Sequence, residues 1–417
     1  MAPKWEEFTF AELIKGGALE IGDGYRAKLS ELGGDGPIFL RAGHVRDTHI
    51  DFSGVDRFDR GLAEAVAAKM SRPGDVVVTT KGNSTGRVAF VEPNMSPFVY
   101  SPHLSYWRSL EIERIVPGFL RYWSRSNYFR DQLAGLAAST DMAPYLSLVD
   151  QRRLRIPLPS PSEQHGIAIT LGALDDKIAL NRLMSETLYE IVRAIFKSWF
   201  VDTEFSTDWR TANLSDVCEY ILSGGTPNTK ITTYWDGDVP WLSSGETRNR
   251  FICRTDRKIT QAGVDNSSTR FVRRGCTVIA SAGQGHTRGQ TSLMMIDSFV
   301  NQSVIALAAD AIVVSDLYLF FDLGRRYDEF RQISDSQSSR GSLTTKLLGE
   351  LRLVVPPRDL IAKFDQTVRP LVNRIGLSVE EGYVLTSLRD TLLPKLVSGE
   401  IRVTPNLHIS LTGSGKD

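Results

Sequence analysis

Apolar residues recur along two long stretches of the chain at the spacing of a helix that packs against another helix. In the first stretch they alternate in steps of four and three, pass over two polar positions at Asn181 and Ser185, and then resume in register. The pattern predicts two long helices. Their expected seam residues are Ile167, Leu171, Leu174, Ile178, Leu188, Val192, Ile195 and Trp199 in the first, and Phe364, Val368, Leu371, Ile375, Leu385, Leu392 and Leu396 in the second.

Two such helices in one chain most simply pair with each other, and opposite directions would make the pair an antiparallel coiled coil. A helix from Gln164 to Trp199 would be about 54 Å long at ~1.5 Å per residue. The alternative is that each helix packs on its own globular domain. Asn181 and Ser185 would fix the register of a pair, because a buried polar residue penalises slipped pairings.

The two helical stretches belong to an internal duplication. A shift of 197 residues aligns residues 154–159 with residues 351–356, and residues 173–180 with residues 370–377, without a gap. Each copy is typical of a short apolar strand, a break that contains proline, and a long helix. The two helices are therefore expected to occupy equivalent places in two copies of one structure.

The segments ahead of the helices repeat more weakly. Residues 72–78 match residues 273–279, each as a turn followed by a β-branched strand that enters a polar, glycine-rich loop. We expect an α+β chain in which two divergent globular domains are separated by the long helices. The expected division is 1–153 for the first domain, 154–205 for the first helical region, 206–350 for the second domain, 351–403 for the second helical region, and 404–417 for a flexible tail.

Composition and charge indicate less about the fold and function of the chain than the internal repeat does. Hydrophobic residues make up 41% and charged residues 24% of the 417 residues, which is typical of globular domains. The net charge is zero, but the segment from Arg248 to Arg288 contains nine basic residues and only two acidic ones. That local excess would suit contact with phosphates, and equally a solvated loop face.

Cysteine usage and hydropathy bear on location. Cys218, Cys253 and Cys276 show no metal-ligand spacing, so we expect reduced thiols. The N-terminus lacks the basic and then apolar pattern of a signal peptide, and no apolar run approaches the ~20 residues that a membrane span needs. These features predict a cytoplasmic protein with no membrane partner.

Motifs of enzymes are missing from the sequence. Gly283 and Gly285 lack the strand–helix setting and the ribose-binding acid of a dinucleotide site, and there is no phosphate-binding loop with Gly-Lys-Ser/Thr. The runs typical of adenine methyltransferases and paired metal-binding histidines are also missing. Asp75 and Lys81 flank a strand as a nuclease pair would, without the second acid. We expect no catalytic residue, metal or cofactor.

Several runs resemble the specificity subunits of Type I restriction–modification systems. The family's central conserved region is resembled by residues 156–164 (IPLPSPSEQ), 174–181 (LDDKIALN) and 196–202 (FKSWFVD), and its C-terminal conserved region by residues 388–401 (LRDTLLPKLVSGEI). The opening of a target-recognition domain is resembled by residues 223–227 (SGGTP) and 238–246 (DVPWLSSGE). The resemblance covers nearly the whole chain. It departs where the usual double proline is split around Ser160 and where residues 21–25 (IGDGY) replace the SGGTP run.

The resemblance implies a non-catalytic, sequence-specific DNA-binding subunit. Each target-recognition domain would read one half of a bipartite target in double-stranded DNA, and the paired helices would set the gap between the halves. The helices would also dock two modification subunits, which carry the adenine methyltransferase and bind S-adenosylmethionine, with restriction (motor-nuclease) subunits as further candidate partners. The alternatives are a DNA nuclease or methyltransferase with an unrecognised site, and a scaffold that binds only protein.

Polar loops supply the candidate DNA contacts, with a solvated loop as the alternative for each. Glycine-rich loops let backbone amides approach phosphates, while hydroxyl and guanidinium groups donate hydrogen bonds. Base reading needs bidentate groups such as Arg and Asn, which follow the expected strands 37–40 and 239–242. The candidates are Arg41, His44, Arg46, Lys81, Asn83, Ser84, Thr85 and Arg87 in the first domain, and Thr226, Lys230, Arg248, Asn249, Ser281, Gln284, His286, Thr287, Arg288 and Arg340 in the second.

Overall fold

The computed structural model describes residues 5–46, 49–137, 145–202, 209–283, 286–337 and 341–403. Gln284, Arg340 and the expected tail at 404–417 lie outside the described residues. The chain mixes helices with sheets, as the sequence predicts. It forms two compact units, one from residues 1–176 and 385–417 and the other from residues 177–384.

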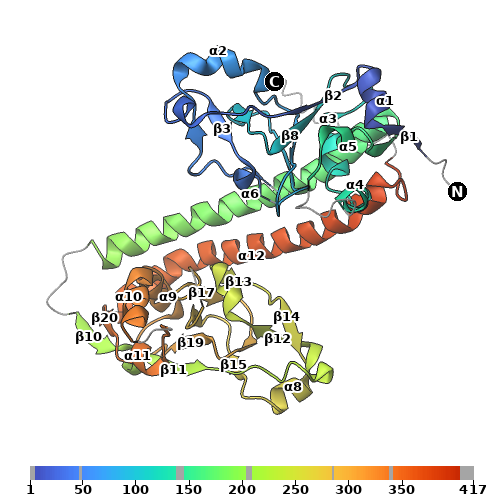
Figure 1. The fold of residues 1–417 in the computed structure, drawn as a ribbon. Helices are drawn as coiled ribbons and strands as arrows, with labels where there is room; N and C mark the ends of the chain where they lie inside the picture. Colours follow the sequence, from blue (N-terminus) through green and yellow to red (C-terminus); the bar gives the residue numbers. More distant parts are fainter. Residues whose placement is uncertain are drawn as a thin grey trace, which may run out of the picture. The chain divides into compact units, whose positions relative to one another are not determined.

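The boundaries between the units fall inside two long helices. These are α6 (Pro161–Phe200) and α12 (Arg358–Val397), each 40 residues in length (Figure 1). At ~1.5 Å per residue each helix is about 60 Å long. Each unit therefore combines one globular domain with a portion of both helices, so the first unit includes the far end of the chain.

Small mixed sheets make up the first globular domain. Its strands are β1 (Glu6–Thr9), β2 (Leu19–Asp23), β3 (Ile38–Leu40), β4 (Asp56–Arg57), β5 (Val76–Thr79), β6 (Val88–Phe90), β7 (Phe98–Tyr100), β8 (Leu104–Ser109) and β9 (Arg155–Leu158). Its α-helices ahead of α6 are α1 (Phe10–Lys15), α2 (Ala63–Val66), α3 (Pro117–Trp123), α4 (Asn127–Ala137) and α5 (Leu148–Gln151). An antiparallel sheet has the order β2-β8-β5-β6, and a second sheet, β4-β3-β7, contains the parallel pair β3–β7. Strand β1 pairs antiparallel with β9.

The second globular domain repeats this plan. Its strands are β10 (Arg210–Asn213), β11 (Cys218–Ser223), β12 (Trp235–Leu242), β13 (Phe251–Ile252), β14 (Arg257–Ile259), β15 (Arg270–Val272), β16 (Thr277–Ala280), β17 (Thr291–Met294), β18 (Ser298–Val300), β19 (Val304–Ala309) and β20 (Arg352–Val355). Its α-helices ahead of α12 are α7 (Leu214–Val217), α8 (Gln261–Asp265), α9 (Asp316–Gly324), α10 (Tyr327–Gln337) and α11 (Thr345–Gly349). The sheet orders are β11-β19-β16-β17-β13 and β14-β12-β18-β15, and β10 pairs with β20. The parallel pair β12–β18 corresponds to β3–β7, which confirms the duplication.

The β-branched runs become central strands because both of their faces are buried. Val76 and Val78 of β5 pack in one apolar cluster with Trp107, while Val77 between them packs in another cluster with Tyr100. Strand β16 is divided in the same way, with all four of its residues buried. A strand that is covered on both sides shows a continuous apolar run in place of an alternating one.

In the first unit the two long helices pair with each other and with the globular domain. Ile167 and Leu171 of α6 are fully buried in one cluster with Trp123 of α3 and Leu396 of α12. Arg389 of α12 donates a hydrogen bond to Asp175 of α6 at 2.8 Å. Arg402, just past α12, pairs with Glu163 near the start of α6, so the helices run antiparallel here.

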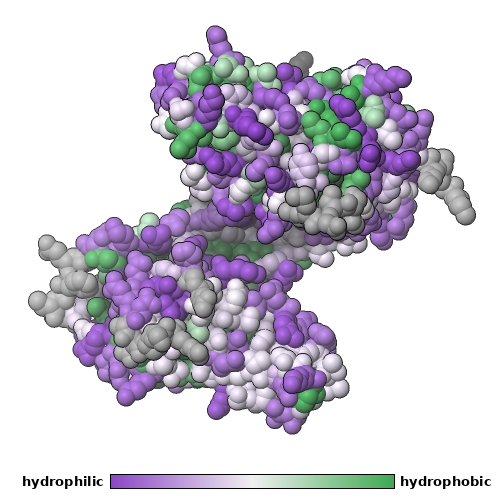
Figure 2. Space-filling view, viewed as in Figure 1, coloured by the Kyte–Doolittle hydropathy of each residue, from purple (hydrophilic) through white to green (hydrophobic). Residues whose placement is uncertain are grey.

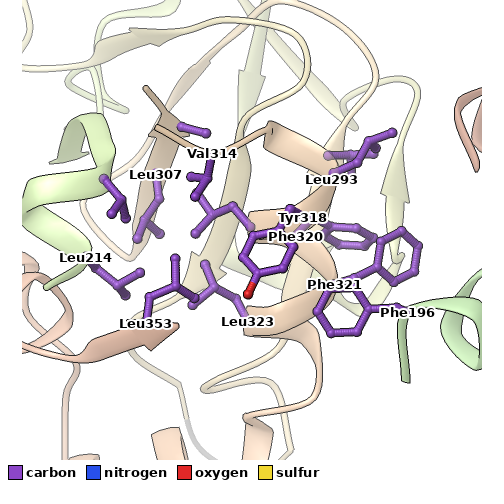
Figure 3. Close-up of a cluster of buried hydrophobic side chains, with 14 of the residues drawn as sticks. Phe196, Leu214, Leu293, Leu307, Val314, Tyr318, Phe320, Phe321, Leu323 and Leu353 are labelled. Atoms are coloured by element: carbon purple, nitrogen blue, oxygen red, sulfur yellow. The ribbon is translucent and has the colours of Figure 1, made fainter. Parts of the chain in front are cut away.

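In the second unit the same two helices pair through aromatic residues. Phe196 of α6 lies 5.7 Å from Phe364 of α12 between ring centroids and also contacts Tyr318 and Phe321 of α9 (Figure 3). Val192 and Val368 are fully buried in the same cluster. Lys177 pairs with Glu381 at 3.3 Å near the other end of this portion, so the helices again run antiparallel.

All of the expected seam residues are buried or half-buried. Both proposed modes of packing occur together, because each helix contacts its partner helix and a globular domain at once. Asn181 is 1% exposed and donates to Glu381 of α12 at 2.9 Å, so it links the two helices. Ser185 donates to the carbonyl of Asn181 in its own helix.

Asp175 holds three guanidinium groups, those of Arg121, Arg125 and Arg389, at 2.8–3.3 Å. Burial alone would raise the pKa of Asp175, but the hydrogen bond from Arg389 and the charges of Arg125 and Arg121 outweigh it and hold the pKa below the ordinary value of 3.8. The ionised carboxylate therefore stabilises the folded first unit at neutral pH.

We expect Asp175→Asn to lower the free energy of unfolding at pH 7 by about 2 kcal/mol, because three clustered cations lose their shared anion. Since the folded pKa is depressed, the difference from the unmodified chain should shrink as the pH falls below 3.8. Urea titrations at several pH values measure both effects. The exposed neighbour Asp176 provides the control, and Asp176→Asn should change stability by less than ~0.5 kcal/mol. Equal effects of the two substitutions would contradict this role of Asp175.

Candidate nucleic-acid interface

Two polar segments of the first domain follow buried strands, as the sequence predicts. The first comes after β3 and forms the short 3-10 helix η2 (Ala42–His44). Arg41 pairs with Asp56 at 2.6 Å and Arg46 with Asp51 at 2.9 Å, and both arginine side chains are about half exposed. A phosphate would therefore compete with a carboxylate at each arginine. Partial burial lowers the pKa of His44, so its ring is neutral at pH 7.

The second segment is the loop that follows β5. Thr79 donates to the carbonyl of Ser84, and Thr85 donates to the carbonyl of Gly82 at 2.7 Å, so the loop closes on itself. Arg87 donates to the carbonyl of Val45 at 3.2 Å. That bond brings the two candidate segments together. Lys81 and Asn83 are exposed at the tip of the loop.

Beside the first segment the domain has a hollow of about 470 Å³. Its lining includes Arg26, Arg41, Ser101 and His103. The Ser101 hydroxyl is buried without a hydrogen-bond partner in the described part of the chain. Sequence reasoning found only Arg41 among these residues, because Arg26 and His103 follow other strands and meet Arg41 only in the folded domain.

Most candidates of the second domain are accessible. Arg248 and Asn249, at the end of the 3-10 helix η6 (Ser244–Arg248), are exposed, and Arg248 lies 3.9 Å from Asp256. Lys230 and His286 are exposed as well. The half-buried candidates are Thr226, which donates to Gln302 at 2.6 Å, and Thr287. Figure 2 shows polar residues over most of the visible face of each unit.

Two candidates of the second domain are buried instead. Ser281 is 4% exposed, and its backbone carbonyl accepts from Leu343. Arg288 is 7% exposed, donates to the carbonyl of Gly341 at 2.8 Å and pairs with Asp335. The Arg288 side chain thus fastens the glycine-rich loop to the segment after α10, and its contact with DNA stays a prediction.

The basic stretch of the second domain does not form one free surface. Arg250 lies over the ring of Tyr189, Arg254 over Tyr383 and Arg257 over Trp235, each with the guanidinium 3.6–3.9 Å from the ring centroid. A further member, Arg273, pairs with Asp316 at 2.6 Å. These contacts stabilise the second unit, so the local excess of charge overstates the number of cations that could meet phosphates.

The remaining chemistry is sparse. Cys218, Cys253 and Cys276 are free thiols, and burial raises their pKa to about 12, 11 and 12 respectively. Within the described ranges, no group of three or more His, Cys, Asp and Glu side chains could hold a metal ion. No helix in this part of the chain is both long and apolar enough to cross a bilayer.

Known proteins with the same features are Type I specificity subunits. The family model for the Type I restriction modification DNA specificity domain matches residues 206–366. The chain is 20% identical to the MjaIX specificity subunit of Methanocaldococcus jannaschii, over 84% of this chain and 83% of that protein. It is 21% identical to the HindI specificity subunit of Haemophilus influenzae, over 87% and 94% respectively.

The fold leads to the same class. The crystal structure of the S subunit of a Type I restriction–modification system from M. genitalium superposes with a TM-score of 0.64, at 18% identity, over 95% of this chain and 96% of that one. Duplicated α+β domains on two long helices are thus a fold of specificity subunits. These similarities confirm the resemblance seen in the sequence motifs: residues 206–366 match the family's DNA specificity domain, and the chain is similar to Type I specificity subunits over most of its length.

We expect Arg288→Ala to lower the free energy of unfolding of the second unit by about 2 kcal/mol, because it leaves the carbonyl of Gly341 and the carboxylate of Asp335 without this partner. Arg248→Ala, at an exposed site of the same unit, should change it by less than ~0.5 kcal/mol. Urea unfolding at constant m-value measures both. An unchanged midpoint for Arg288→Ala would show that this arginine is not structural.

Proposed function

We propose that the chain is the non-catalytic DNA-reading subunit of a Type I restriction–modification complex in the cytoplasm. The observation that carries the proposal is the duplicated loop. A polar, glycine-rich loop follows β5 in one domain and β16 in the other, and each is bonded to a later backbone amide, from Leu146 to Thr80 and from Leu343 to Ser281. Loops held by a rigid scaffold are the usual carriers of binding residues. Two such loops fit a double-stranded target with two halves.

The long helices are suited to set the gap between the halves of the target. Each passes from one unit into the other without a break, and each unit holds its portions of α6 and α12 together by its own seam. A paired, buried seam resists bending and sliding, so the helix length between the units would fix a spacing in the DNA.

The helices also fit the docking of modification subunits. Seven large apolar residues remain 44–70% exposed along them, which are Ile169, Leu180, Leu183, Ile191, Leu377, Val384 and Leu388. Exposed apolar residues that gather on a surface mark sites for other proteins. The modification subunits would supply the adenine methyltransferase and S-adenosylmethionine, with restriction subunits as further partners, so the chain itself needs no cofactor.

Lengthening both helices tests the spacing. We expect one heptad inserted in α6 between residues 176 and 177, and another in α12 between residues 384 and 385, to add about 10 Å and to widen the gap by about three base pairs. Selection of bound duplexes from a random pool, with the modification subunit present, reads out the gap. A heptad in α6 alone is the control, and it should impair binding because it shifts the seam. An unchanged gap in the folded double insertion would rule out this role of the helices.

Removing exposed apolar residues tests the docking. The double substitution Leu180→Ser and Leu183→Ser should abolish co-purification with the modification subunit, whereas Val149→Ser, at an equally exposed residue outside the two long helices, should not. Calorimetry gives a second readout. The chain alone should give no heat with S-adenosylmethionine, and the complex should bind it. Stoichiometric binding by the chain alone would contradict the non-catalytic assignment.

A further inference from the structure

The hollow beside residues 41–46 of the first domain lies where two parallel strands end. Strands β3 and β7 run in the same direction, so the residues that follow them, Arg41 and Ser101, lie at the same edge of the sheet and both line the hollow. A further wall comes from the segment that includes the 3-10 helix η1 (Leu29–Glu31). The hollow of about 470 Å³ is therefore built from three separate stretches of the first domain.

Backbone contacts fix the walls of the hollow. The amide of Tyr25 donates to the carbonyl of Tyr100 at 2.7 Å, and the amide of Ser101 donates to the carbonyl of Leu40 at 3.0 Å. A Cβ atom built on Gly24 would lie 2.0 Å from the carbonyl oxygen of Ser101, so the chain can pass this close only with glycine at that position. The hollow is thus a feature of the folded backbone and not a gap between long side chains.

The hollow lies among the candidate DNA contacts of the first domain. The amide of Thr80, at the start of the loop after β5, donates to the carbonyl of His103 at 2.9 Å. Arg87 of the same loop donates to the carbonyl of Val45. These two bonds hold the loop after β5, residues 41–46 and the lining of the hollow next to one another. A duplex that meets the two candidate segments would therefore meet the hollow as well.

Most of the lining is apolar. Six of its ten residues are Ala27, Leu29, Leu32, Phe39, Ala42 and Pro102. Phe39 is 4% exposed and packs edge to face on Phe58, with 5.2 Å between ring centroids, so this part of the wall is rigid. Leu29 is 87% exposed, more than any other large apolar residue in the described part of the chain. An exposed leucine beside an apolar hollow is typical of a binding surface.

The charged residues of the lining suit a neutral group in the hollow. The Arg41 guanidinium pairs with Asp56 at 2.6 Å and lies 5.4 Å from the ring centroid of Phe39. A guanidinium next to a carboxylate keeps N–H donors for a neutral acceptor but attracts an anion less strongly. Arg26 and His103 are exposed, and such side chains suit the phosphates that flank a base.

The hydroxyl of Ser101 lacks a partner. Ser101 is 5% exposed, and its hydroxyl oxygen is buried without a hydrogen bond in the described part of the chain. Buried polar groups of folded proteins are nearly always hydrogen-bonded, so we expect a group that binds in the hollow to supply the partner. The folded chain itself should lose nothing when this hydroxyl is removed, because it makes no bond there.

We propose that the hollow reads a thymine in the half-site of the first domain. The inference rests on the proposed contact of this domain with DNA, and it names a base that the domain selects. In the major groove a thymine presents its C5 methyl group and, beside it, the acceptor O4. The apolar wall at Leu29 covers the methyl group, and the Ser101 hydroxyl donates to O4.

The first test concerns the methyl group and uses the chain with its modification subunit. Selection of bound duplexes from a random pool gives the target, and replacing each thymine in turn by deoxyuridine removes only a methyl group. At one thymine this replacement should weaken binding about 3–10-fold, as expected for roughly one buried methyl group. Leu29→Ser should abolish the difference between thymine and deoxyuridine at that position. Ile112→Ser, at another exposed apolar residue of the first domain, should preserve it.

The second test concerns the hydroxyl group. Ser101→Ala should weaken binding of the selected duplex about 3–10-fold, through loss of one hydrogen bond, without lowering the midpoint of urea unfolding. Thr277→Val is the matched control. It removes another buried hydroxyl without a hydrogen bond in the described part of the chain, in β16 of the second domain, and should leave binding unchanged.

The inference is wrong if the unmodified complex selects a bipartite duplex in which no thymine methyl group affects binding. It is also wrong if the difference between thymine and deoxyuridine survives in Leu29→Ser, or if Ser101→Ala binds as tightly as the unmodified chain. Equal weakening of all sequences by Leu29→Ser, with a lower salt dependence, would assign the hollow to a backbone phosphate instead. Loss of the modification subunit from folded Leu29→Ser would assign Leu29 to a protein contact.

Failure of the proposed function gives a different result. In that case the unmodified chain, in its complex, would bind no duplex at all, and the comparison of thymine with deoxyuridine could not be reached. Selective binding by the unmodified complex together with any of the contrary results above would overturn the reading of thymine alone.

Discussion

The burial of one apolar stripe of α6 against one apolar stripe of α12 is the interaction on which both units depend. Ile167 and Leu396 share a cluster in the first unit, as Val192 and Val368 do in the second. Because both helices contribute to both units, neither globular domain is complete with only its own stretch of chain. The first unit in particular needs residues 385–403, which come after the whole of the second domain. Loss of the last helix would therefore expose apolar faces on both domains.

The arginines of the two globular domains have different kinds of partner. The arginines of the second domain are largely engaged by its own acids and aromatic rings, as Arg288 and Arg257 illustrate. In the first domain Arg125 and two other arginines share the carboxylate of Asp175. The duplication thus preserves the architecture while the ion pairs differ between the two copies. Such divergence is possible because loops can vary while the buried strands beneath them stay fixed.

The periodicity of apolar residues predicted the helices, the repeat and the strands. These elements depend on which residues are buried, and buried positions recur in the sequence at regular spacings. The seam even predicted α12 through Pro370, a residue that ordinarily disfavours a helix interior. The sequence predicted which loops carry the candidate contacts, but not which residues of those loops are accessible. Arg288 lies in a polar loop, where a phosphate contact is expected. Its actual partners, Gly341 and Asp335, come much later in the chain, so the loop sequence does not reveal them.

The most direct test of the account is to map methylated adenines in DNA exposed to the unmodified chain together with its modification subunit and S-adenosylmethionine. The account predicts methylation within two short specific sequences separated by a constant number of unspecified base pairs, and none when the chain is omitted. Methylation at one uninterrupted sequence, or the same pattern without the chain, would contradict the claim that its two domains read the two halves of a DNA target.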